Sequence, residues 1–74
     1  MTEKTLDLRG LKCPLPVLRI RKALAGSKAG DVLIVTCTDP LAGIDIPILL
    51  NETGDVLEDT RTEARVITFR IRKN

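Results

Sequence analysis

Alternation of apolar and polar positions along the chain predicts four β-strands. The clearest is Val32–Cys37, which is apolar on both faces, as expected for a central strand. Val66–Ile71 alternates regularly, which turns three of its side chains inward: Ile67, Phe69 and Ile71. Less extensive patterns predict a short first strand, Thr5–Leu8, and a weaker third strand, Asp55–Thr60.

Apolar residues at helical spacing predict a first helix over Pro16–Ala25. Val17, Ile20 and Leu24 fall on one stripe with Ala23 beside it, and Gly26 or Ser27 ends the helix. On the helical wheel the stripe leaves Leu15 and Leu18 largely outside. They lie beside Arg19 and Lys22, and Arg21 borders the stripe on its other side.

A second helix is predicted from about Asp45 to Thr53, followed by Gly54. Asp39 with Pro40 behind it has the character of an N-cap, worth about 1 kcal/mol, and Asp45 with Pro47 offers a second start. We expect a turn after Pro40 and the helix from Asp45. Asp39 could also serve as a surface contact for a basic partner.

The order βαβαββ with short connections predicts an α+β fold. It is a two-layer α/β sandwich, in which two helices cover one face of a four-stranded mixed sheet, and residues 1–74 form a single domain. If the first two strands run parallel, the loop at Cys13 and the loop at Asp39–Pro40 emerge at the same edge of the sheet. Sites in α/β folds favour that edge.

Composition excludes several chemistries. The 74 residues include no histidine, so the chain can form neither a Cys–His nor a Ser–His dyad. With only two cysteines and no histidine, we do not expect a zinc site within the chain. We therefore expect no metal and no cofactor. Phe69 is the one aromatic residue, and a net charge of +2 does not by itself indicate nucleic-acid binding.

The lengths of the apolar runs in the sequence bear on the cellular location of the protein. No window approaches 18 continuous apolar residues, and Met1-Thr2-Glu3-Lys4 has no apolar run typical of a signal peptide. We expect a cytoplasmic protein with no membrane association, in a compartment where thiols stay reduced.

The most informative motif is Lys12-Cys13-Pro14-Leu15-Pro16, directly before the first helix. A residue before proline favours extended geometry, which keeps Cys13 out of the helix interior. The free N–H groups of Leu15, Val17 and Leu18, with Lys12 and Arg9 nearby, are expected to lower the pKa of the thiol and favour the reactive thiolate. The alternative is a small apolar residue packed beneath the helix start.

The second cysteine, Cys37, ends the central strand at the same edge. It could be a resolving thiol for Cys13, but a buried residue with an inert thiol is the favoured interpretation. Leu15 and Leu18, with Arg19, Arg21 and Asp39, are candidates for a partner-binding surface beside the thiol.

The segment Gly10-Leu11-Lys12-Cys13-Pro14-Leu15-Pro16-Val17, followed by Asp39-Pro40 and Asp45-Ile46-Pro47, resembles the TusA (SirA-like) sulfur-carrier family over about residues 5–72. The resemblance implies a single TusA-like domain with the same architecture. It also implies that Cys13 carries sulfur as a persulfide. The family often has an acidic residue between the two prolines, where this chain has Leu15.

The resemblance implies two partner proteins. One is a sulfur donor, a cysteine desulfurase or a rhodanese-like protein, and the other is an acceptor in tRNA thiolation, cofactor assembly or sulfur oxidation. Such a carrier is of the sulfurtransferase type. The same protein is both the substrate that receives sulfur and the transferase that delivers it, so whether it is called an enzyme is partly a matter of definition. We expect a monomer that makes no direct contact with nucleic acid.

Two other functions remain open from the residues. A small RNA-binding or regulatory module would use a basic C-terminal half, although aromatic residues for base stacking are nearly absent and acidic residues are interspersed. Its basic residues would be Arg61, Arg65, Arg70, Arg72 and Lys73. A redox sensor would need a disulfide between Cys13 and Cys37.

Overall fold

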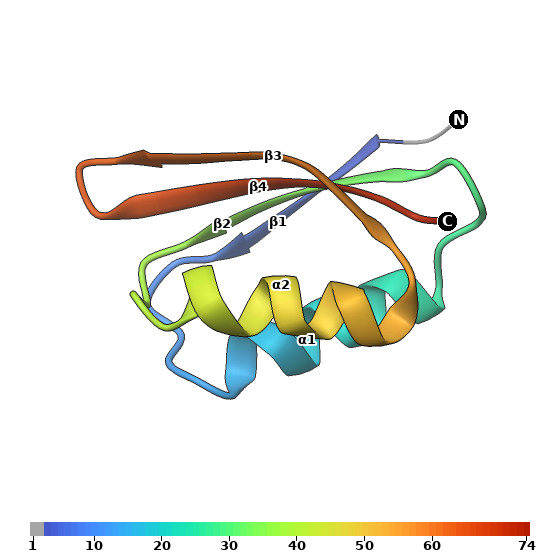
Figure 1. The fold of residues 1–74 in the computed structure, drawn as a ribbon. Coiled ribbons are helices and arrows are strands. Elements are labelled where there is room, and N and C mark those ends of the chain that lie inside the picture. The colour runs from blue at the N-terminus through green and yellow to red at the C-terminus, as the bar shows by residue number, and fades with distance from the viewer. Residues whose placement is uncertain (1–2) are drawn as a thin grey trace.

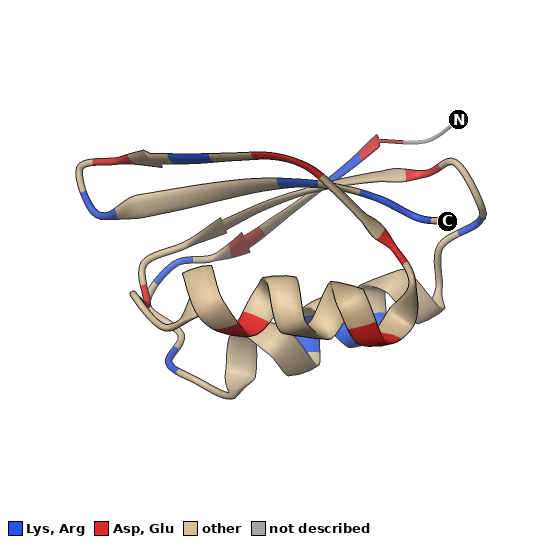
Figure 2. Cartoon of the chain, viewed as in Figure 1, with Lys and Arg blue, Asp and Glu red and all other residues tan. Residues whose placement is uncertain are grey.

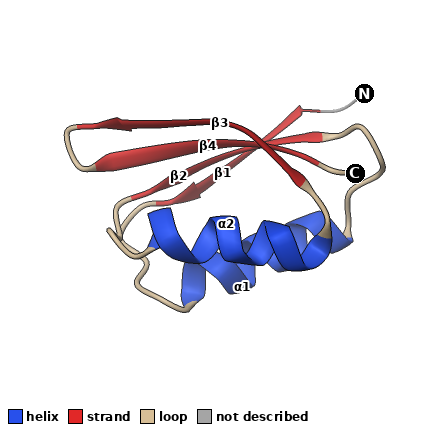
Figure 3. Cartoon of the chain, viewed as in Figure 1, coloured by secondary structure: helices blue, strands red, loops and turns tan. Residues whose placement is uncertain are grey.

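The computed structural model describes residues 3–74, and Met1 and Thr2 of the N-terminal segment lie outside the described residues. Two helices cover one face of a four-stranded sheet (Figures 1 and 3). In chain order the elements are β1 Glu3–Leu8, α1 Leu15–Ala25, β2 Val32–Cys37, α2 Ala42–Thr53, β3 Val56–Glu63 and β4 Val66–Arg72. The predicted α+β two-layer sandwich is confirmed.

The sheet has the strand order β1-β2-β4-β3. β1 and β2 run parallel, with Leu8 opposite Cys37, whereas β4 is antiparallel to both of its neighbours. β2 therefore lies inside the sheet, as its apolar sequence predicts. The loops that follow β1 and β2 lie together at the left of Figure 1, at the start of both helices.

The core lies between the helices and the sheet and is aliphatic except for Phe69. Phe69 and Ile71 are fully buried, and Ile67 packs against the core with part of its surface exposed, so the predicted inward face of β4 is confirmed. From α1 the core receives Ile20 and Leu24. From α2 it receives Ala42, Ile46, Leu49 and Leu50.

The predicted start of the second helix at Asp45 is wrong, because α2 begins at Ala42. The backbone is already turning before that point: the Ala42 N–H donates to the Asp39 carbonyl at 3.0 Å, and the Asp45 N–H to the Leu41 carbonyl at 2.9 Å. Burial of Ala42 stabilises this early turn. Pro47 lies inside the helix, where it removes only the N–H that would pair with the Gly43 carbonyl.

The third strand begins one residue later and ends three residues further along the chain than predicted. It continues to Glu63, which pairs with Val66 across a two-residue turn. Both turn residues have positive φ, 49° at Ala64 and 69° at Arg65. Such turns favour Asn-Gly, so Ala-Arg gives no hairpin signal in the sequence, and the tight turn is imposed by the pairing of β3 with β4.

Replacing Ala64-Arg65 by Asn-Gly should raise the free energy of unfolding by about 1 kcal/mol, because left-handed geometry is costly for residues with an ordinary Cβ. Urea denaturation of the variant and wild type measures the change. The control is Arg61→Gly in β3, where extended geometry gives glycine no advantage and stability should fall. A less stable Asn-Gly variant would contradict the assignment of strain to this turn.

Candidate functional site

Two loops meet at the edge of the sheet where β1 and β2 end. The Gly10 N–H donates to the Thr38 hydroxyl at 2.8 Å, and the Cys13 N–H donates to the Asp39 carboxylate at 2.6 Å. Gly10 has a φ of 84°, a conformation that a residue without Cβ adopts readily. The parallel pairing of the strands therefore brings Cys13 and Asp39 together, as predicted.

Asp39 connects these loops and does not cap the helix. The N-cap position of α2 is Leu41, and no side chain caps it. One Asp39 carboxylate oxygen, Oδ1, accepts the Leu41 N–H at 3.0 Å, while Oδ2 accepts the Cys13 N–H. The predicted N-cap role is wrong, because α2 begins at Ala42 and its N-cap position is Leu41, two residues after Asp39. The bond from Cys13 to Asp39 spans 26 residues of sequence and depends on the tertiary fold.

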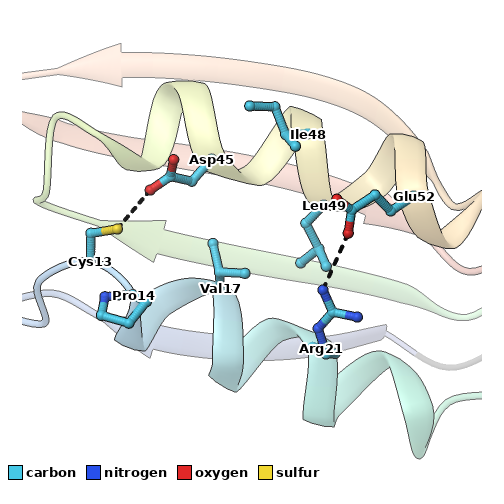
Figure 4. Close-up of a pocket in the computed structure, with 8 residues that line it drawn as sticks. All are labelled: Cys13, Pro14, Val17, Arg21, Asp45, Ile48, Leu49 and Glu52. Carbon is cyan, nitrogen blue, oxygen red and sulfur yellow. Dashed lines mark hydrogen bonds and ion pairs between the residues drawn. The ribbon is translucent and has the colours of Figure 1, made fainter.

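The Cys13 thiol is exposed at the start of α1, and the Cys13–Pro14 bond is cis. Its sulfur points across to α2, where Sγ donates a hydrogen bond to Asp45 Oδ2 at 2.9 Å (Figure 4). Exposure excludes the alternative in which Cys13 packs beneath the helix. Sequence reasoning missed Asp45 as a site residue, because its position before Pro47 was interpreted only as a helix start.

The expected lowering of the Cys13 pKa is wrong: the pKa is raised. The hydrogen bond to Asp45 is the largest cause, followed by partial desolvation and by the negative charges of Asp45 and Asp39. Moreover, two of the backbone N–H groups expected to stabilise the thiolate donate hydrogen bonds to backbone carbonyls instead. The Leu15 N–H donates to Lys12 and the Leu18 N–H to Pro14.

The thiol lies at the side of a groove between the helices, with a volume of about 280 Å³, which we call the thiol groove. Arg21 and Glu52 form an ion pair across it at 3.4 Å (Figure 4). Arg21 was expected on a free docking surface, whereas it is held in this pair. The lining residues are Cys13, Pro14, Val17, Arg21, Asp45, Ile48, Leu49 and Glu52.

Large apolar side chains are exposed on α1, on α2 and at the residue before α2. Among the described residues, the large hydrophobic side chains with exposed fractions between 44% and 61% are Leu15, Leu18, Leu41, Ile44 and Ile48, which we call the apolar rim. The predicted exposure of Leu15 and Leu18 is confirmed. The other three were missed, although the spacing of Ile44 and Ile48, opposite the buried Ile46, could have indicated an exposed helical face. Arg19 and Lys22 are also exposed.

Cys37 is fully buried at the end of β2, as the favoured interpretation predicts. Burial, with a smaller effect from the Asp39 charge, raises the pKa of its thiol to about 11. Both cysteines are free thiols. A buried, protonated thiol is a poor nucleophile, which disfavours the redox-sensor alternative.

Basic and acidic residues are interspersed along the C-terminal half (Figure 2), and ion pairs join most of the basic ones to acids. Arg70 contacts Glu3 and Glu58, and Arg72 also contacts Glu58. Arg61 and Lys73 are paired with Asp59 and Asp55 respectively. These pairs neutralise the surface that an RNA-binding module would use.

Residues 3–74 contain no group of three or more histidine, cysteine, aspartate or glutamate side chains arranged to hold a metal ion. None of their helices is long and apolar enough to cross a membrane.

Known proteins resemble the chain over nearly its whole length. A candidate sulfur carrier protein of Neisseria meningitidis serogroup A is 48% identical over 69 residues, which cover 93% of each chain. The sulfur carrier protein TusA of Allochromatium vinosum is 38% identical over 72 residues, 97% of this chain and 95% of that protein.

Structural similarity agrees. The crystal structure of the SirA-like protein from Desulfitobacterium hafniense superimposes with a TM-score of 0.81 at 30% identity, covering 93% of this chain and 95% of that one. The family model described as "Sulfurtransferase TusA" matches residues 4–73. With fold and sequence both matched, the chain belongs to the TusA family of sulfur carrier proteins.

Proposed function

We propose that the protein carries sulfur as a persulfide on Cys13. The observation that supports this most is the exposed Cys13 thiol at the meeting point of both helix starts, beside a groove and surrounded by apolar side chains. Cys37, the other thiol, is buried. Membership of a sulfur-carrier family supports the same role.

The transfer is a thiol exchange that leaves the overall oxidation state unchanged. Cys13 Sγ attacks the terminal sulfur of the donor's persulfide, and a new S–S bond forms. The S–S bond of the donor breaks, its electron pair leaves with the donor's cysteine sulfur, and the proton lost from Cys13 ends on that sulfur. Delivery to an acceptor cysteine repeats the exchange in the opposite direction.

The partners are a sulfur donor, either a cysteine desulfurase or a rhodanese-like protein, and a sulfur acceptor protein in the cytosol. Both must approach Cys13, so both must contact the apolar rim. Arg19 and the loop of Asp39 are further partner contacts. Arg21 has an indirect role, because its ion pair with Glu52 spans the thiol groove. An RNA-binding role has less support, because the basic C-terminal half is neutralised by ion pairs.

Incubation with a cysteine desulfurase and cysteine should add the mass of one sulfur atom to the protein, on Cys13 and removable by a reductant. Cys13→Ser should fold normally and gain nothing, because its hydroxyl cannot form a persulfide. Cys37→Ala is the matched control and should load like wild type. Mass spectrometry of intact protein and of peptides measures all three. Equal loading of wild type and Cys13→Ser would exclude Cys13 as the carrier.

Leu18→Asp and Arg19→Glu should each slow loading by the desulfurase without unfolding the domain. Both side chains are exposed on α1, and exposed substitutions typically change stability by less than about 0.5 kcal/mol. Arg61→Glu, a charge reversal on the exposed strand β3, is the control and should load at the wild-type rate. Single-turnover loading rates measure the effect. If Leu18→Asp and Arg19→Glu both load at the wild-type rate, the α1 surface is not a binding site for the desulfurase.

A further inference from the structure

Two carboxylates from different segments contact Cys13, one at its thiol and one at its backbone N–H. Asp45 Oδ2 of α2 accepts its S–H hydrogen bond at 2.9 Å. Asp39, in the loop after β2, accepts the backbone N–H of the same residue at 2.6 Å. A single residue thus receives two anionic contacts, one at its reacting atom.

The remaining charged groups around the thiol do not offset these anions by direct contact. Lys12 is exposed in the same loop, and the loop continues with the uncharged Pro14 and Leu15. In the thiol groove α1 contributes Arg21, which is paired with Glu52 of α2. Below the loop, β2 contributes Cys37, which is buried and protonated at neutral pH.

This arrangement has a consequence for loading, since only the thiolate attacks a persulfide efficiently. A carboxylate that accepts the S–H proton stabilises the thiol over the thiolate, because deprotonation would leave two anions at hydrogen-bond distance. The carrier has no histidine that could serve as a base. A group that neutralises the negative charge of Asp45 would therefore raise the thiolate fraction of Cys13.

We propose that Asp45 holds the resting Cys13 thiol protonated, and that the sulfur donor releases it by placing a cationic side chain, lysine or arginine, against Asp45. The proposal rests on the proposed sulfur-carrier function. Charge complementarity identifies the partner group: the centre of the site is anionic, and the apolar rim around it excludes water when a partner docks. Exclusion of water strengthens an ion pair formed there.

The step balances without an added oxidant or reductant. Pairing of the cation with Asp45 removes the acceptor of the S–H bond, and the Cys13 proton moves to the departing cysteine sulfur of the donor as the new S–S bond forms. After loading, Sγ has no hydrogen to donate to Asp45, so the contact that holds the empty thiol is lost. The bound sulfur is then free to turn toward the acceptor.

The first test measures the thiol alone. In a Cys37→Ala background, the rate of alkylation by iodoacetamide is followed against pH for wild type, Asp45→Asn and Asp45→Ser. Both Asp45 variants should alkylate faster at pH 7, with midpoints shifted to lower pH. Glu63→Gln removes one negative charge from the exposed strand β3, outside the thiol groove, and should keep the wild-type profile.

Circular dichroism checks that each variant is folded. Two different Asp45 substitutions are used so that the test still works if one of them fails to fold. Unchanged profiles in the Asp45 variants, or an equal shift in Glu63→Gln, would overturn the role of Asp45. This readout does not involve sulfur transfer, so it decides the role of Asp45 even if the carrier function fails.

The second test concerns the cation of the partner. Asp45→Lys should alkylate faster than wild type yet load more slowly from a cysteine desulfurase with cysteine, because the introduced cation repels that of the donor. If Asp45→Lys both alkylates and loads faster than wild type, the proposal that the donor places a cation against Asp45 is wrong. If wild type does not load but the alkylation profiles shift as expected, the proposed function fails while the effect of Asp45 on the thiol stands.

Discussion

The parallel pairing of β1 with β2 is the constraint on which the site depends. With Leu8 opposite Cys37, the two strands end level, and their loops leave the sheet side by side. Two side chain–backbone hydrogen bonds then join those loops, from Gly10 to Thr38 and from Cys13 to Asp39. A parallel pair needs a crossover, and α1 supplies it on the same face as α2. The helix starts therefore converge on one thiol.

The charge state of that thiol is decided by its nearest contact. A helix N-terminus acts as roughly half a positive charge spread over the first turn. Asp45 has a full negative charge, and its oxygen lies 2.9 Å from the sulfur. The closer and larger charge dominates, and the pKa of Cys13 rises although the helix start alone would lower it. Position at a helix start is therefore insufficient to predict a reactive cysteine.

The two faces of the molecule are suited to different tasks. The helical layer presents the apolar rim, which is the surface that we propose a partner protein contacts. Across the strands, by contrast, Arg70 and Arg72 are held by Glu58 and Glu3, so that this surface has little unpaired charge for a polyanion.

The sequence by itself determined the order of elements, the central position of β2, the buried face of β4 and the exposure of Cys13, Leu15 and Leu18. These follow from local periodicity and from proline geometry, which act over a few residues. The comparisons with known proteins agree with the family resemblance that the motifs around Cys13 and Asp45 suggested.

Only the tertiary structure decided the start of α2, the β3–β4 turn and the contact between Cys13 and Asp45. Each depends on residues distant in the sequence or on the pairing of whole elements: Cys13 and Asp45 are 32 positions apart, and the turn at Ala64-Arg65 forms because β3 and β4 pair on either side of it. Local propensity contains no information about such contacts. Electrostatic effects on a thiol depend on distance in space, which the fold alone fixes.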